Sequence, residues 1–120
     1  NWVWSAIHLD DGSHLHGVDI RIPGMPPIGI GYSQRADEPL VELQSVTADY
    51  SLGSDDLPVS TTLRLQPGDI EATVDIQGHA PVLLVAPDGR VSQFPRAWAK
   101  VRTADGRSGV GWLEWNRNIS

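Results

Sequence analysis

Apolar and polar residues alternate in short runs along most of the chain, a pattern typical of half-buried β-strands. No window repeats apolar residues at helical spacing, and 12 Gly and 9 Pro interrupt the chain at short intervals. Turn signals separate the runs, including the pairs Asp11-Gly12, Asp88-Gly89 and Asp105-Gly106. We therefore predict an all-β domain of about eight or nine antiparallel strands, arranged as a meander in a barrel or a sandwich.

The predicted hairpin over residues 2–22 is the most informative of these elements. A two-residue type I′ turn at Asp11-Gly12 would pair Leu9 with His14 and Ile7 with His16. One face then carries Val3, Ser5, Ile7, Leu9, His14, His16, Val18, Ile20 and Ile22. The opposite face carries Trp2, Trp4, Ala6, His8, Leu15, Gly17, Asp19 and Arg21. Aromatic rings mixed with polar and titratable groups are typical of a ligand pocket, so we expect this second face to line one.

Two further segments carry specific expectations. The continuous apolar run 82–85 is typical of a strand covered on both faces. The last predicted hairpin spans residues 96–115 around Asp105-Gly106, and a two-residue turn there pairs Trp98 with Leu113. That register places Trp98 and Trp115 on one face with Arg96, Lys100 and Arg102. Such a face is expected either where the stems of the cations pack over the Trp rings or where another barrel covers it.

Composition narrows the function classes. The 120 residues suffice for one domain, 1–120, with a real core. A formal net charge of −6 disfavours nucleic acid and anionic membranes as partners. The absence of cysteine excludes disulfides and thiolate chemistry, and no apolar run reaches the roughly 18 residues of a membrane span. Because the first residue is Asn1 rather than Met and a strand pattern follows it at once, we expect the chain to begin inside a larger protein or after processing. The cytoplasm is slightly favoured as its location.

Both ends of the chain resemble one family. The stretches Trp2-Val3-Trp4 and Leu9-Asp10-Asp11-Gly12 resemble the start of a domain in lipocalin-like (calycin) proteins grouped with carotenoid 1,2-hydratases and AttH-like proteins. The stretch 109–115, Gly-Val-Gly-Trp-Leu-Glu-Trp, resembles the strand that closes their C-terminal domain. The resemblance implies the second of two tandem β-barrels, with a missing N-terminal barrel as partner. It also implies hydratase or cyclase chemistry on isoprenoids for some members, and we transfer no catalytic residue from it.

Histidines raise the question of a metal. His14 and His16 lie two apart on one strand, a spacing that can chelate a metal ion. A cupin-type site also needs a nearby carboxylate and a third histidine, but Asp19 falls on the other face and His79 lacks the surrounding pattern. We therefore predict no metal site and no cofactor, and keep His14 and His16 only as weak candidate ligands.

Six residues form the predicted ligand-binding set: Trp2, Trp4, His8, Asp19, Arg21 and Glu114. If the protein is an enzyme, Asp19 or Glu114 could donate the proton of a hydration or cyclisation, and His8 could relay it. Asp19 and Arg21 could equally be an ordinary ion pair on one strand.

Three functions are compatible with the sequence. The first is binding of a hydrophobic small molecule, a lipid or isoprenoid, and it requires a barrel with a cavity. The second is a hydratase, isomerase or cyclase, which needs a buried acid in that cavity. The third is a structural half that docks on a second barrel or subunit, which needs a large exposed apolar patch.

Overall fold

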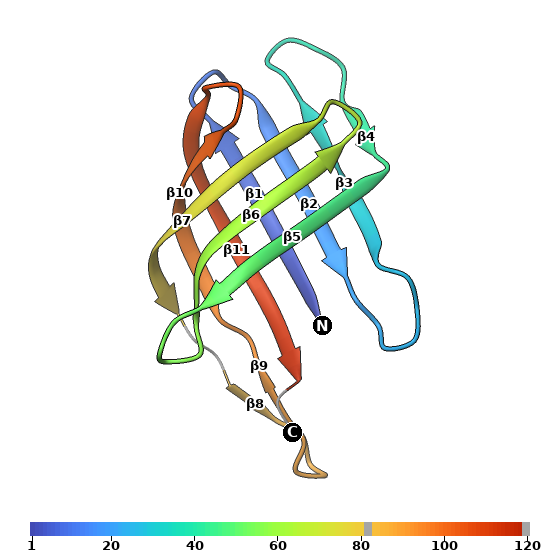
Figure 1. Ribbon diagram of the computed structural model, residues 1–120, viewed down its shortest axis with the longest axis vertical. Coiled ribbons are helices and arrows are strands. Elements are labelled where there is room, and N and C mark those ends of the chain that lie inside the picture. The colour runs from blue at the N-terminus through green and yellow to red at the C-terminus, as the bar shows by residue number, and fades with distance from the viewer. Residues whose placement is uncertain (81–82, 119–120) are drawn as a thin grey trace.

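The computed structural model describes residues 1–80 and 83–118, and this part of the chain is built of strands and turns (Figure 1). The strands are β1 (Trp2–Leu9), β2 (His14–Ile20), β3 (Ile28–Gln34), β4 (Val41–Leu43), β5 (Ser45–Leu52), β6 (Pro58–Gln66), β7 (Ile70–Ala80), β8 (Leu83–Val85), β9 (Val91–Gln93), β10 (Arg96–Thr103) and β11 (Ser108–Asn118). The prediction of an all-β antiparallel fold is confirmed. In the described residues, no helix is long and apolar enough to cross a membrane.

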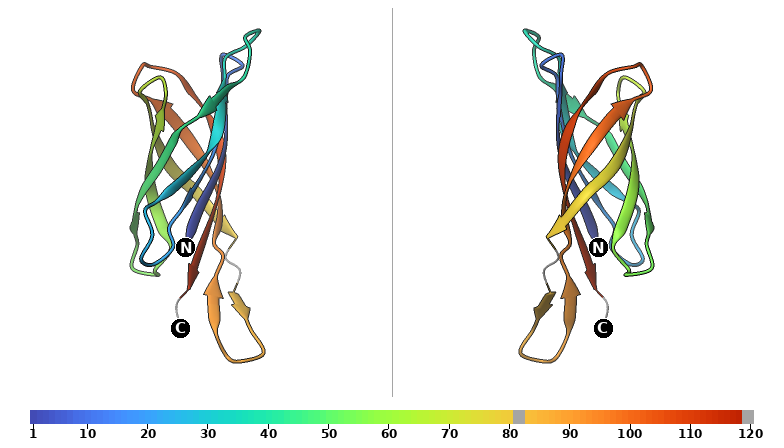
Figure 2. Two further views of the ribbon diagram at one scale, coloured as in Figure 1. Left: turned by 90° about the vertical axis from the view of Figure 1, so that its right-hand side faces the viewer. Right: turned by 90° about the vertical axis from the view of Figure 1, so that its left-hand side faces the viewer.

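Nine strands follow one another around a nearly closed barrel in the order β4-β3-β2-β1-β11-β10-β7-β6-β5. The first and last long strands of the chain, β1 and β11, are neighbours and pair from Trp2–Asn116 to Leu9–Gly109. The strands β5, β6 and β7 form a wall that crosses the wall of β1, β2 and β11 (Figures 1 and 2). The short hairpin β8–β9 projects from one end of the barrel.

The barrel closes through a bent strand. Only Gln44 separates β4, which pairs with β3, from β5, which pairs with β6. Beyond this bend β5 runs close to Gly29 of β3, where an added Cβ would lie 2.3 Å from the backbone nitrogen of Val46. Further along, β5 is joined to β2 by a side chain, because the amide of Ala48 donates a 2.9 Å hydrogen bond to Asp19. The seam therefore opens only past Asp19, at the end of the barrel where β1 begins.

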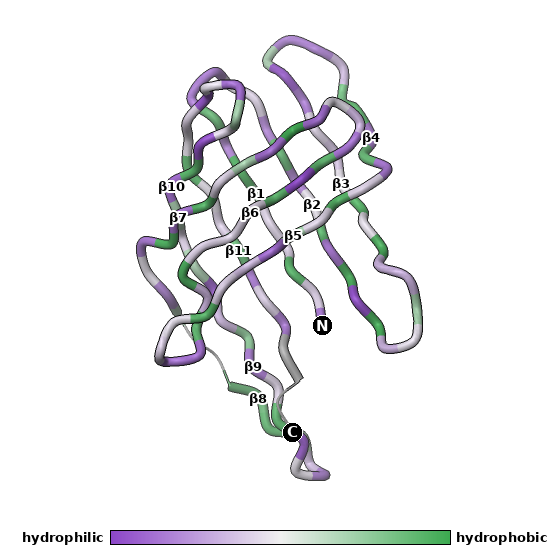
Figure 3. Tube along the Cα trace, in the orientation of Figure 1, coloured by the Kyte–Doolittle hydropathy of each residue, from purple (hydrophilic) through white to green (hydrophobic). Residues whose placement is uncertain are grey.

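The barrel interior is packed over most of its length. Apolar and polar residues alternate along the long strands, as the changing colours of Figure 3 show, and the buried apolar side chains form one core. The fully buried members include Ile7, Leu15, Leu63, Leu113 and Trp115. This core excludes a cavity that runs through the whole barrel, and leaves room for a ligand at the open end.

The predicted hairpin registers were each wrong by one residue. In the first hairpin His8 pairs with His14 and Ala6 with His16, and in the last hairpin Trp98 pairs with Trp112. The first loop has three residues, closed by a hydrogen bond from the Leu9 amide to the Ser13 carbonyl. Because side chains alternate with period two, the shift moves His14 and His16 to the outer face and leaves Asp19 inside.

The run that begins at Leu83 also differs from expectation. Residues Leu83, Leu84 and Val85 form β8, and all three side chains are exposed rather than covered on both faces. The remaining residue of that run, Val82, lies outside the described residues.

Candidate functional site

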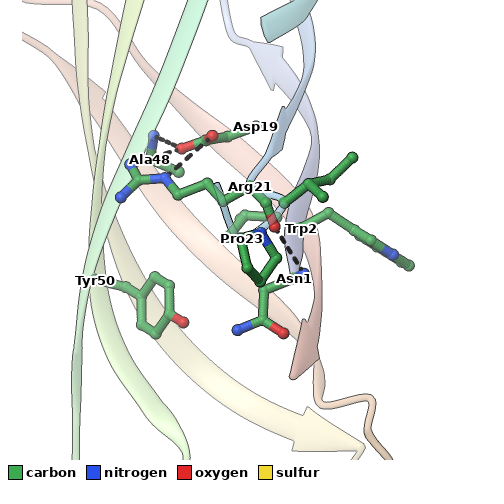
Figure 4. A pocket seen from close by; sticks show the side chains of 9 residues that line it. Asn1, Trp2, Asp19, Arg21, Pro23, Ala48 and Tyr50 are labelled. Carbon is green, nitrogen blue, oxygen red and sulfur yellow. Dashed lines mark hydrogen bonds and ion pairs between the residues drawn. The ribbon is translucent and has the colours of Figure 1, made fainter. Parts of the chain in front are cut away.

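A pocket of about 570 Å³ opens at the end of the barrel where the seam between β2 and β5 diverges. Figure 4 shows that β1, β2 and β5 contribute to its walls, with Tyr50 projecting from β5 and Asn1 lying across from it. The residues that line it are Asn1, Trp2, Val3, Asp19, Arg21, Ile22, Pro23, Ala48 and Tyr50. An apolar wall with a few placed polar groups is the usual composition of a small-molecule site.

Asp19 is the most buried charged residue of this pocket, with 2% of its surface exposed. Its Oδ1 accepts a 3.3 Å hydrogen bond from Nε of Arg21, and its Oδ2 accepts bonds of 3.0 Å from the Arg21 guanidinium and 2.9 Å from the Ala48 amide. Both oxygens thus have partners, as a buried carboxylate requires. The side chain therefore joins two strands and orients Arg21 rather than presenting an unpaired acid.

Arg21 carries the positive charge at the pocket mouth. The hydrogen bond with Asp19 raises the pKa of Arg21 above its ordinary value, so the guanidinium stays charged. Half of its side chain is exposed, and Asp49 approaches it at 3.9 Å. A permanent cation beside apolar walls suits a molecule with an apolar body and a polar end.

Behind Tyr50, the barrel interior holds a small group of polar atoms. The Tyr50 ring meets the Trp115 ring edge-on at 6.4 Å between centroids, and the His79 ring lies 6.3 Å from that of Trp115. On the neighbouring strand β6, Thr61 pairs directly with Tyr50. Within the part of the chain that the structure describes, three buried side-chain polar atoms have no hydrogen-bond partner: Oγ1 of Thr61, Nδ1 of His79 and Nε1 of Trp115.

A β-bulge directs His79 into the barrel. In the pairing of β7 with β10, Ala99 lies opposite Ile76 but Trp98 lies opposite Gly78, so Gln77 is an extra residue. The next pair, Ala97 with His79, therefore points inward, and Ala97 is fully buried. Bulges are found next to functional sites because they re-aim a side chain in this way.

Of the predicted ligand-binding set, Trp2, Asp19 and Arg21 come together at the pocket. Trp4 and Glu114 lie on the outer face, where they line a shallow groove of about 380 Å³ with Trp2, Val18 and Ile20. Glu114 is paired there with Arg96 at 3.2 Å. The expectation that Trp4 shares a face with Asp19 was wrong, for the register reason given above.

His8 lies on the outer face at the turn end of β1, away from the pocket. Its Nδ1 lies 2.8 Å from Nδ1 of His14, and the His16 ring stacks on Tyr32 at 4.8 Å. Burial first, then the charges of His8 and His14, lower the pKa of His16. Among the described residues, no group of three or more His, Cys, Asp or Glu side chains could hold a metal ion.

Tyr50, Thr61, His79 and Trp115 were not predicted as site residues. Tyr50 and Thr61 lie in alternating runs that read as ordinary strands, and the bulge that turns His79 inward leaves no pattern except the neighbouring Gly78. Trp115 was expected on the same face as Trp98, but it is fully buried whereas Trp98 is 46% exposed.

The fold and the pocket define a nearly closed antiparallel β-barrel whose interior is open at one end. The chain belongs to the family DUF7064, described as a domain of unknown function, whose profile matches residues 1–119. No curated protein matches the sequence.

Two solved structures share the fold. An AttH-like protein from Nitrosomonas europaea superposes with a TM-score of 0.72 at 19% identity, over 98% of this chain and 39% of that one. Kievitone hydratase from Nectria haematococca superposes with a TM-score of 0.65 at 10% identity, over 99% of this chain and 39% of that one. The chain therefore spans about two fifths of the length of both solved chains. At these identities the likeness shows the fold, and it confirms the resemblance noted in the sequence.

Proposed function

We propose that this domain binds a hydrophobic small molecule, a lipid or isoprenoid, at the open end of the barrel. The observation that carries the proposal is the pocket of about 570 Å³ whose walls combine Trp2, Val3 and Tyr50 with the charged Arg21. The rest of the interior is filled by the core, so the apolar body of a ligand would lie at this end, beside Arg21.

The test is a titration of the ¹⁵N-labelled protein with 2-naphthol, followed by NMR. We expect shifts at the backbone amides of Val3, Ala48 and Tyr50. The variant Ala48→Phe fills the pocket and should abolish these shifts, whereas the matched variant Thr47→Phe lies on the other face of the same strand and should keep them. Shifts confined to the indoles of Trp98 and Trp112 would contradict the proposal.

An enzyme of hydratase, isomerase or cyclase type is the first alternative, favoured by the shared fold with kievitone hydratase. Asp19 is the buried acid that this alternative needs, but Arg21 and the Ala48 amide already hold both of its oxygens. Incubation with an isoprenoid alkene in deuterated water separates the two functions. A catalyst would incorporate deuterium and lose that activity in Asp19→Asn, and a binding domain would leave the alkene unlabelled.

A docking role is the second alternative, and the outer face of the barrel favours it. Trp98 and Trp112 are paired neighbours that are 46% and 41% exposed, with Val110 beside them at 52%. Since both solved relatives have chains about two and a half times as long as the matched part, we take a second barrel of the same polypeptide as the occupant. Acrylamide should then quench Trp98 and Trp112 less in the longer polypeptide than in the 120-residue chain. Equal quenching would contradict this role.

A further inference from the structure

The three unpartnered polar atoms behind Tyr50 have complementary hydrogen-bonding roles. Nε2 of His79 lies 2.6 Å from the carbonyl oxygen of Pro58, which can only accept, so Nε2 carries the proton. In the neutral ring Nδ1 is then an acceptor, and it is buried without a partner. The Trp115 indole N–H is only a donor, and the Thr61 hydroxyl can do both.

A hydroxyl group matches this set of atoms. Its oxygen can accept from the Trp115 N–H, and its proton can be donated to Nδ1 of His79. A carboxylate, which only accepts, would leave Nδ1 of the neutral His79 ring facing a second acceptor, and an ammonium group, which only donates, would leave the Trp115 N–H facing a second donor. Buried polar groups are nearly always paired in native proteins, so the unpaired Nδ1 of His79 and Nε1 of Trp115, on rings 6.3 Å apart, point to a ligand.

Tyr50 connects this group to the pocket. Its side chain lines the pocket on one side and contacts the Trp115 ring on the other. It is only half-buried, and Figure 4 shows its ring projecting from β5 into the pocket. A rotation of this one ring would expose the Trp115 edge to a molecule already held in the pocket.

We propose that the domain selects hydroxylated apolar molecules, and that their hydroxyl group lies behind Tyr50 between Nδ1 of His79 and the indole N–H of Trp115. This inference rests on the proposed function, since the apolar body of the same molecule would occupy the open end of the barrel. It names the ligand class as a neutral alcohol or phenol.

The test compares 2-naphthol with 2-methylnaphthalene, which differ only by a hydroxyl and a methyl group of similar size. Binding of each is measured by fluorescence and by the ¹⁵N shifts of the Trp115 indole and the His79 ring. We expect 2-naphthol to bind at least about tenfold more tightly, because its hydroxyl pairs the buried Nδ1 of His79 and the Trp115 N–H, whereas a methyl group leaves both unpaired. Only 2-naphthol should shift the His79 ring nitrogen.

Two variants keep the inference falsifiable. His79→Phe and Thr61→Val preserve shape but remove polar atoms, and each should reduce the preference for 2-naphthol. The matched variant Thr62→Val lies on the other side of the same strand and should leave the preference unchanged, with circular dichroism confirming the fold of all three. If both probes bind wild type and variants equally well, this inference is overturned while the proposed function stands. If neither probe binds wild type, the proposed function itself fails.

Discussion

At the scale of single residues, Asp19 connects the strands at the barrel seam to the charged group at the pocket mouth. Its carboxylate lies inside the barrel, accepts a hydrogen bond from the Ala48 amide of β5, and forms an ion pair with Arg21 at the pocket mouth. One side chain thus substitutes for the backbone pairing that β2 and β5 lack. Removing one partner of a buried ion pair lowers the free energy of unfolding, because the other partner stays buried with its charge and hydrogen-bonding groups unpaired.

Replacing Asp19 by Asn should therefore lower the free energy of unfolding by about 2 kcal/mol, because an amide can satisfy the Ala48 amide but not also the Arg21 charge. Urea denaturation followed by circular dichroism measures this. The control is Asp49→Asn, which removes an exposed ion pair with Arg64 and should change stability by less than about 1 kcal/mol. Equal effects of the two substitutions would show that the seam does not depend on Asp19.

At the scale of elements, the three Asp-Gly hairpins share one loop geometry. Each loop has three residues, and its last residue, Gly12, Gly89 or Gly106, has a φ angle between 87° and 95°. A hydrogen bond closes each loop from the residue before it to the residue after it, as from Thr103 to Arg107. This is a turn with a glycine in the left-handed conformation, and it displaces the strand register by one residue from the two-residue form.

Gly106→Ala should lower the free energy of unfolding by about 1 kcal/mol, since a Cβ is disfavoured at a φ of 95°. An added Cβ at Gly106 would meet no atom within 4 Å, so the cost is conformational rather than steric. Gly106→Asn should recover part of the loss because asparagine tolerates this conformation. Thermal unfolding of the two variants provides the comparison, and an alanine variant as stable as the wild type would rule out the loop geometry.

The outer face of the β1–β2 hairpin should make stability depend on pH. The pKa of His16 is lowered in the folded protein by burial and by His8 and His14, so the unfolded chain binds the proton more readily. Stability is therefore complete above about pH 6.5 and falls as the pH drops from there through the lowered folded pKa. Denaturant titrations between pH 7.5 and 5 should show this decline, and His16→Gln should flatten it. The lowered pKa of Asp105, about 2, acts only in more acidic solution.

At the scale of the whole molecule, close backbone approach closes the barrel. Gly29 of β3 faces the backbone of Val46, and Gly17 of β2 faces the side chain of Val46. The absence of side chains at these two positions lets β5 cross the first sheet wall, which leaves the pocket as the remaining opening at that end.

Gly29→Ala should destabilise the protein by more than about 3 kcal/mol, because its Cβ would overlap the Val46 backbone nitrogen at 2.3 Å and backbone cannot yield as a side chain can. Hydrogen exchange should also become faster at the amides of β5. Ile30→Ala, at an exposed neighbouring position, should change stability by less than about 1 kcal/mol. A stable Gly29→Ala variant with slow exchange in β5 would mean that the seam is looser than described.

The sequence by itself determined the strand content, the antiparallel hairpins and the place of each Asp-Gly turn, because alternation and turn residues act over a few positions. It also brought Trp2, Asp19 and Arg21 forward as pocket residues. Which side chains of paired strands share a face depends on whether the hairpin loop has two or three residues, and local propensity does not resolve this. Trp4 and His8 were therefore assigned to the same face as Asp19, which was wrong.

Only the tertiary structure could place Tyr50, His79 and Trp115 around one point, since they come from three strands far apart in the chain. The bulge at Gln77 and the closure of the barrel bring these three side chains together, and both arise from packing between the walls of the barrel rather than from a local sequence pattern.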